Sequence, residues 1–569
     1  MSADQRVKVV LMWHMHQPQY RRADTGMYAE PWVYLHAIKD YVDMAAHLEQ
    51  ATMARAVVNF VPVLLDQIAD YVEQIDQFLR TGKTLQDPLL NGLAGVFPVE
   101  PQGRLALMQW CLRANRKRLI EPWPVYAQLV EMVEWLGTRP QALSYVNDAF
   151  LRDLVMWYHL VWLGETVRRS DERVKALLQK ARDFDAADAR QMIEVIGGLL
   201  KGLPARYRAL EDAGRVELSF SPYSHPIVPL LIDWTVAREA QPDVTLPPGA
   251  PYPDGLARAR AQITAGQAAF SRHFGRTARG CWLSEGGVSH AALQLLDELH
   301  VEWTASGGAV LVHSLGNGGP DPSVPLGPYC VGDTHVHCFF RDDDLSDRIG
   351  FRYAEWRADD AVGDLVAGLE KRAQALEHTE SPVIPIILDG ENAWEYYAHN
   401  GFYFLQALYE RLSVHPVLSL GTFADVLDHG AVPRALPRLV AGSWVYGTFS
   451  TWIGSADKNR AWELLVRVKQ AADDALRSRT FTAAQAAAID RQLMVCEGSD
   501  WFWWYGDYNP RDSVAAFDAL YRAHLRRLFS LMGVPPPDAL EQVLGVGHGE
   551  PMRGGTMRAT HGDFQGGAT

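Results

Sequence analysis

The sequence predicts an α/β protein with parallel strands, arranged as a barrel with long insertions and followed by a mainly helical region. Short buried strands alternate with helices from Lys8 to Leu412, which is the pattern of a parallel sheet covered by helices. From about Leu436 onward, helical segments follow one another without strong strands between them. Hydrophobic residues make up 48% of the chain and charged residues 21%, so the chain can bury a large core.

Seven segments are predicted to be strands because they are short, apolar and, in most cases, rich in β-branched residues. In chain order they are Lys8–Trp13, Arg55–Val61, Val216–Phe220, Gly280–Leu283, Val301–Ala305, Thr334–Phe340 and Val383–Leu388.

Helices are predicted between these strands from the spacing of their apolar residues. One charged, Ala/Leu-rich stretch, residues 174–208, is expected to be interrupted near Pro204, because proline removes a helix hydrogen bond. The other helical segments are 42–50, 66–82, 104–135, 255–273, 292–299, 361–378, 403–412, 459–477, 483–496 and 513–532.

We therefore expect three parts: a barrel-type region of residues 1–430, a helical region of residues 431–540 and a tail of residues 541–569. The tail is rich in glycine and poor in apolar residues, which predicts disorder. The N-terminus has no long apolar segment of the signal-peptide kind, and no run of apolar residues is long enough to cross a membrane.

Charge and cysteine content exclude several classes of protein. Acidic residues outnumber basic ones and the net charge is −14, which argues against binding nucleic acid or an anionic membrane surface. The five cysteines form no CxxC pair, so neither a disulfide framework nor a Cys-rich zinc site is predicted. We expect a cytoplasmic protein, because unpaired cysteines fit a reducing compartment.

Two histidines, His14 and His16, stand at the end of the first predicted strand. At i and i+2 they point to the same side of the strand, and parallel α/β folds place ligands beyond the carboxyl ends of their strands. The pair could bind a metal, hydrogen-bond a polar substrate or serve only to build a turn.

Two carboxylates also follow predicted strands. Glu285 lies between a tryptophan and two glycines, and could be a nucleophile, a base or an ion-pair partner. Asp389 directly follows a buried apolar strand, where a carboxylate without compensation would be costly. A helix N-cap is the structural alternative for Asp389.

Three further segments are unusual in composition. The proline-rich loop after Phe220 presents Tyr223 and His225, and the aromatic segments Gly442–Gly454 and Ser499–Asp507 can line a cleft as well as a core. The charge-dense segment 341–353 could hold a metal, but a solvated surface is the more common structure for such a run.

Together these segments resemble the α-glucanases of glycoside hydrolase family 57, closest to their amylopullulanase and α-amylase branch. Five segments match the family regions in order, and the aromatic segment from Ser499 resembles a further one. The five are His14–Pro18, Val216–Leu231, Cys281–Ser289, Ile387–Tyr397 and Gly442–Gly454.

The resemblance implies an incomplete (β/α)7 barrel with helical insertions, followed by a helical domain that completes the cleft. It implies a retaining α-glucan hydrolase with Glu285 as nucleophile and Asp389 as general acid/base, and neither metal nor cofactor. The expected substrate is an α-glucan such as maltodextrin, starch or glycogen. The residues expected to contact it are His14, His16, His225, Trp282, Trp394, Trp444 and Trp452.

Three alternatives remain open from the sequence. The same residues could serve a 4-α-glucanotransferase. The histidine pair could belong to a metal-dependent hydrolase. The chain could also bind α-glucans without turning them over. The sequence leaves open α-1,4 against α-1,6 specificity, endo against exo action, and the oligomeric state.

Overall fold

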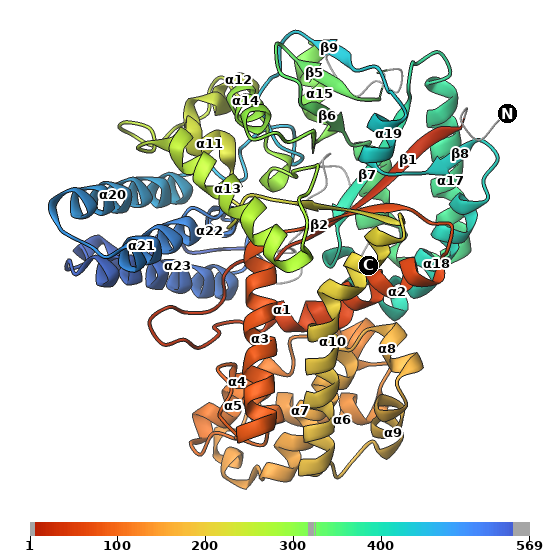
Figure 1. Cartoon of the computed structure of the whole chain (residues 1–569). Coiled ribbons are helices and arrows are strands. Elements are labelled where there is room, and N and C mark those ends of the chain that lie inside the picture. The colour runs from red at the N-terminus through yellow and green to blue at the C-terminus, as the bar shows by residue number, and fades with distance from the viewer. Residues whose placement is uncertain (1–5, 317–323, 325, 550–569) are drawn as a thin grey trace.

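Parallel strands form the centre of the molecule in the computed structural model, which describes residues 6–316, 324 and 326–549 (Figure 1). The central strand β1 (Val7–Met15) pairs with three others, β2 (Ala56–Phe60), β7 (Val383–Asp389) and β8 (Leu418–Leu420). On the far side of β2 lies β3 (Val216–Phe220). All of these pairs are parallel, as the sequence predicts.

A second sheet continues the ring of strands. Its order is β4 (Trp303–Ser306), β6 (His337–Phe340), β5 (Tyr329–Val331) and β9 (Arg434–Leu436). At the end of β6, the backbone N–H of Asp342 donates to Pro385 O on β7 over 2.8 Å. This contact brings the second sheet back to the first, in agreement with a barrel-type fold.

The segment Gly280–Leu283, predicted to be a strand, lies between β3 and β4 but forms only isolated bridges, Phe220 with Cys281 and Gly280 with Trp303. A Cβ atom at Gly280 would lie 1.9 Å from the ring of Trp303. Glycine therefore allows the close approach that connects the two sheets at this point.

Most of the predicted helices of the barrel-type region are confirmed, with shifts of a few residues at their ends, but the predicted helical segment 104–135 is divided between the two α-helices α5 and α6. The long helices α3 and α10 run side by side and carry a helical insertion beyond one end of the barrel, at the bottom of Figure 1. The helices that accompany the strands are α2 Val42–Gln50, α3 Pro62–Thr81, α10 Ala186–Asp212, α13 Gly255–Phe274, α14 His290–Glu298, α17 Ala358–Ala375 and α18 Phe402–Ser413. The insertion contains α4 Pro88–Leu93, α5 Pro101–Trp110, α6 Pro124–Gly137, α7 Asp148–Trp162, α8 Glu165–Ser170 and α9 Glu172–Lys180.

The predicted interruption near Pro204 is wrong. The helix α10 runs through Pro204, and the break comes earlier, between α9 and α10. There Ala181 adopts a left-handed conformation (φ 61°) and Asp185 caps α10 together with Asp188. Packing against α3 keeps α10 continuous, because tertiary contacts outweigh the hydrogen bond that one proline removes.

The C-terminal helices lie against one side of the barrel, drawn in blue in Figure 1. They are α20 (Ala456–Ser478), α21 (Ala483–Cys496), α22 (Ser499–Trp504) and α23 (Arg511–Met532). Of the predicted tail, residues 541–549 are described: Leu544 O accepts a hydrogen bond from Arg460 over 2.7 Å. The rest of the tail, 550–569, lies outside the described residues.

One continuous cluster of buried apolar side chains runs from Val9 and Leu11 on β1 to Trp462 and Leu525 in the helical region. The two regions therefore share a core. Within the described part of the chain, no helix combines the length and the apolar character that crossing a membrane requires.

Candidate active site

A cleft opens where the carboxyl ends of β1 and β7 face the C-terminal helices. Its walls include His14 and His16 from β1 and its exit, Asp389 from β7, and Trp503 and Trp504 from α22. The strand register explains part of this arrangement: His14 lies opposite Asn59 on β2 and opposite Asp389 on β7. Parallel pairing thus brings together side chains that are far apart in the sequence.

His14 is held by a buried polar network. Its Nδ1 lies 2.7 Å from Asn59 Oδ1, which also accepts a hydrogen bond from Ser221 Oγ over 3.0 Å. Because Asn59 Oδ1 can only accept, His14 Nδ1 carries the proton and Nε2 is left as an acceptor. Burial and the neighbouring charge of His16 lower the pKa of His14 to about 3, so this histidine is neutral at pH 7.

Three histidine rings stack beside the cleft. The ring of His225 lies 5.0 Å from that of His14 and 4.0 Å from that of His16, measured between centroids. His225 is fully buried behind the cleft wall, and burial together with the charge of His16 lowers its pKa well below 6.5. Its Nδ1 lies 3.1 Å from Ser499 Oγ at the start of α22.

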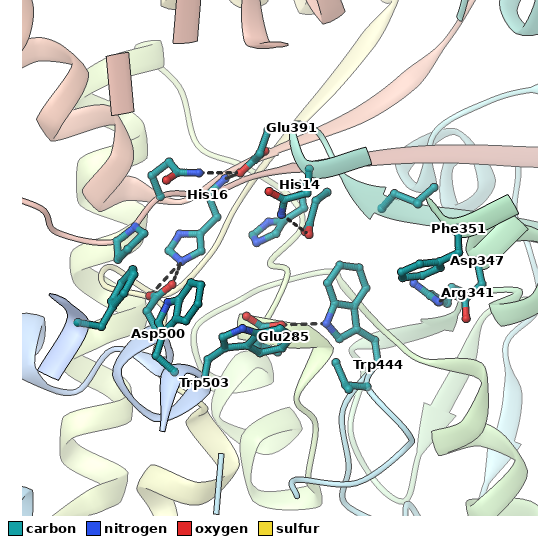
Figure 2. A pocket seen from close by; sticks show the side chains of 18 of the residues that line it. His14, His16, Glu285, Arg341, Asp347, Phe351, Glu391, Trp444, Asp500 and Trp503 are labelled. Carbon is teal, nitrogen blue, oxygen red and sulfur yellow. Dashed lines mark hydrogen bonds and ion pairs between the residues drawn. The ribbon is translucent and has the colours of Figure 1, made fainter. Parts of the chain in front are cut away.

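Glu285 reaches the cleft from a short turn, η6 (Ser284–Gly286), and has a left-handed backbone conformation with φ 59°. Such a conformation is uncommon outside glycine and is concentrated at functional sites. Trp444 Nε1 donates a hydrogen bond to Glu285 Oε2 over 2.9 Å, as Figure 2 shows. Burial and the charge of Asp389 raise the pKa of Glu285, whereas the Trp444 hydrogen bond lowers it.

Asp389 faces the same cleft from the end of β7. Its Oδ2 accepts a hydrogen bond from Asn392 Nδ2 over 2.8 Å. Burial raises the pKa of Asp389, and the Asn392 hydrogen bond and the charge of His16 oppose this shift. The cleft thus contains two carboxyl groups, each with one neutral hydrogen-bond donor and each favoured in its protonated form by burial.

The predicted tryptophans, all of which lie in the described part of the chain, divide into two groups. Trp444 lines the cleft. Trp282, Trp394 and Trp452 are almost completely buried and support its walls from behind. The ring of Trp282 packs 5.2 Å from Trp444, and that of Trp452 packs 5.9 Å from Trp503. Trp394 donates to Gly390 O over 3.0 Å and so braces the turn after Asp389.

Sequence reasoning assigned no role to several side chains that line the cleft. The expected surface position of segment 341–353 is wrong for Arg341 and Asp347. Both side chains are buried, form an ion pair and line the cleft with Phe351. Their burial depends on how this segment packs in the tertiary structure. A run of charged residues in the sequence does not indicate such packing.

Glu391 is a further buried carboxyl group in the cleft. Its Oε1 accepts hydrogen bonds from the backbone N–H of His16 over 3.3 Å and from Gln17 Nε2 over 3.4 Å. Burial and the nearby charges of Asp389 and Asp40 raise its pKa well above 4.5. Its position two residues after Asp389 is the sequence feature that could have identified Glu391 as a residue of the cleft.

Asp500 on α22 was also missed as an acid, although its segment was singled out for its aromatic residues. Its two oxygens lie 2.9 and 3.1 Å from His16 Nε2 (Figure 2). His16, His225 and Asp500 have potential metal-ligand atoms within 4.8 Å of one another. The short His16–Asp500 distance is that of a hydrogen bond, and His14, the other member of the predicted pair, is bonded to Asn59 instead.

Residues 10–437 match the family described as "Glycosyl hydrolase family 57". A search of curated protein sequences found no match.

Three solved structures are similar in fold. A GH57 branching enzyme from Thermococcus kodakaraensis is 16% identical, with 92% of this chain and 90% of that chain covered at a TM-score of 0.56. An α-amylase from Thermotoga maritima is 14% identical, with 93% of each chain covered and a TM-score of 0.56. A 4-α-glucanotransferase from Thermococcus litoralis is 13% identical, with 92% of this chain and 60% of that chain covered at 0.51.

Proposed function

Because this chain belongs to glycosyl hydrolase family 57 and is therefore a glycoside-acting enzyme, we propose that it is a retaining α-glucan hydrolase. It cleaves α-1,4-glucosidic bonds in maltodextrin, starch or glycogen, and its resemblance to the amylopullulanase branch makes α-1,6 bonds a second target. The observation that carries the proposal is the pair of carboxyl groups, Glu285 and Asp389, facing one cleft with a separate hydrogen-bond donor on each.

Retention needs one carboxyl group that is ionised and one that is protonated, about 5–5.5 Å apart across the scissile bond. The N–H of Trp444 stabilises the ionised form of Glu285, which attacks the anomeric carbon. Asp389, whose pKa burial raises, is the protonated partner and donates its proton to the leaving oxygen. Two neighbouring carboxyl groups do not both ionise readily, so an ionised Glu285 favours the protonated form of Asp389.

Formation of the glycosyl-enzyme ester removes the charge of Glu285. The pKa of Asp389 then falls, because the neighbouring negative charge is gone, and Asp389 takes a proton from the attacking water. The neutral His14, with Nε2 as acceptor, suits a hydrogen bond from a sugar hydroxyl group. If an acceptor sugar reaches the ester before water, the same residues perform transfer in place of hydrolysis.

The first test is the product profile from maltoheptaose and pullulan for the wild type and Glu285→Gln. Shorter maltooligosaccharides from the wild type alone are expected. Products longer than maltoheptaose would indicate a 4-α-glucanotransferase, and maltotriose from pullulan would add α-1,6 cleavage. No turnover of any of these by the wild type would contradict the proposal and favour a binding protein. Loss of turnover on adding EDTA, restored by Zn²⁺, would favour the metal-dependent hydrolase.

The acid/base assignment is tested separately with Asp389→Asn and the matched variant Glu391→Gln. Removing a general acid costs about 10²- to 10⁴-fold in rate, so Asp389→Asn should lose that much on maltoheptaose. It should lose far less in the first step on an aryl maltoside, whose leaving group needs no proton. Glu391→Gln should show no such dependence on the leaving group; if it does and Asp389→Asn does not, the assignment moves to Glu391.

A further inference from the structure

The C-terminal helical region delivers a carboxylate into the catalytic cleft. Asp500 lies on α22, 484 residues from its partner His16, and both side chains are largely buried, with 16% and 11% of their surface exposed. In Figure 2, Asp500 points toward His16 on one side of the cleft, while Glu285 lies beside them. The cleft thus contains a negative group that the two-carboxylate mechanism does not use.

The position of Asp500 is set by contacts on both sides of it. The backbone N–H of Ser499 donates to His225 O over 2.9 Å, and Ser499 Oγ lies 3.1 Å from His225 Nδ1. Trp501 Nε1 donates to Val495 O over 2.8 Å inside the helical region. A Cβ atom at Gly498 would lie 2.8 Å from Ser224 O, so the chain approaches the barrel closely just before α22. Asp500 is therefore held in place by the docking of the helical region.

The hydrogen bond also determines how His16 is held. An ionised Asp500 can only accept, so His16 Nε2 carries the proton and points at the carboxylate. The backbone N–H of His16 is bonded to Glu391 at the same time. The ring of His16 lies tilted against that of His225, 4.0 Å away between centroids, and His225 Nδ1 lies 3.7 Å from Glu285 Oε1. Asp500 thus holds the ring of His16 against that of His225, which lies beside Glu285.

We propose that Asp500 is a positioning residue of this active site: it holds His16 through a hydrogen bond that exists only when the helical region is docked, and it adds a fixed negative charge to the cleft. The inference rests on the proposed function. In a retaining mechanism, positive charge develops on the sugar ring in the transition state, and a carboxylate already in place in a water-poor cleft stabilises that charge.

The titratable groups that face Asp500 come from several elements. They are His16 at the exit of β1, Tyr20 in the loop that follows, Glu285 on η6, and His225 in the loop after β3. The charge of Asp500 contributes to raising the pKa of both Tyr20 and Glu285. Removing this charge therefore changes the protonation of the nucleophile itself, which a purely structural contact would not do.

The test separates charge from position with two variants. In Asp500→Asn the amide oxygen can still accept the hydrogen bond from His16, but the charge is lost. The pKa of Glu285 should then fall, so Glu285 stays ionised to lower pH. The acid limb of the kcat/KM profile on maltoheptaose should shift to lower pH and kcat should fall, with little change in KM. Asp500→Ala loses both interactions and should cost about 100-fold in kcat/KM, the effect of a misplaced catalytic group.

Asp507→Asn serves as the matched control, because Asp507 is an exposed acid on the same segment. It should leave the pH profile unchanged, and all variants are compared for melting temperature. An Asp500→Asn profile that overlays the wild type, or a uniform loss without a shift, overturns the inference while wild-type turnover still supports the proposed function. A wild type without turnover overturns both. If Asp500→Ala does not fold, Asp500→Asn alone decides.

Discussion

The indole N–H of Trp444 donates a hydrogen bond to the carboxylate of Glu285, and this bond opposes the effect of burial on the pKa of Glu285. Hydrogen bonds to charged groups contribute about 1.5–3 kcal/mol, so the indole has a substantial share in keeping Glu285 ionised. A second hydrogen bond, from the backbone N–H of Trp444 to Glu285 O over 3.0 Å, holds the two residues side by side.

Replacing Trp444 by phenylalanine should therefore move the pH profile in the direction opposite to Asp500→Asn. Without the indole N–H, the pKa of Glu285 rises and the acid limb of kcat/KM shifts to higher pH. At the optimum, kcat should fall about 10- to 100-fold, in line with the loss of one hydrogen bond to a charged group. Rates on maltoheptaose across the pH range give the measurement.

Trp356→Phe is the matched control, because Trp356 is 40% exposed and packs against Tyr353, away from the cleft walls. A shift in Trp444→Phe that equals the one in Trp356→Phe, or that runs to lower pH, would show that the indole does not tune Glu285.

Among the elements, α13 and α21 join the barrel to the helical region through one buried charge. Glu497, at the C-terminal end of α21, is 1% exposed and accepts hydrogen bonds from three side chains on the barrel side. Arg258 Nε donates to it over 2.6 Å, and Tyr252 and Gln262 each donate over 2.7 Å. This network fixes the end of α21, three residues before Asp500.

Arg258→Met should destabilise the protein by about 3–5 kcal/mol, the usual effect of leaving one partner of a buried ion pair without its counter-charge. Chemical denaturation followed by circular dichroism measures the change. Arg477→Met is the control: the pair of Arg477 and Asp474 is more than 70% exposed on both sides, and such surface pairs contribute about 0–1 kcal/mol. Equal effects of the two substitutions would contradict a structural role for the buried pair.

At the scale of the whole molecule, the shared core predicts that the barrel and the helical region unfold together. Buried apolar side chains are continuous from β1 to α20 and α23, and polar contacts such as His225 with Ser499 cross the boundary. Calorimetry should show one transition, and activity and helical content should be lost over the same temperature range. A separate transition at lower temperature, with activity already lost, would mean that the helical region is an independent unit.

The sequence by itself determined the alternation of strands and helices and the residues that stand where strands end. His14 and Asp389 could be predicted to meet because parallel pairing aligns the carboxyl ends of neighbouring strands, and the register puts them opposite each other. The motif spellings identified the family, and the match over residues 10–437 confirms it. These features are local or follow from the periodicity of a strand, so they can be predicted without coordinates.

Only the tertiary structure decided which side chains face the cleft. Trp394 and Trp452 stand in motifs but are buried, whereas Trp503 and Asp500 line the cleft. Arg341 stands in a run of charges that predicts a surface, yet it is buried against Asp347. The orientation of a side chain depends on how whole elements pack, through contacts such as His16 with Asp500 that join distant parts of the chain. The pattern of apolar and polar residues along the sequence contains no information on those contacts, because they form only when the helical region docks on the barrel.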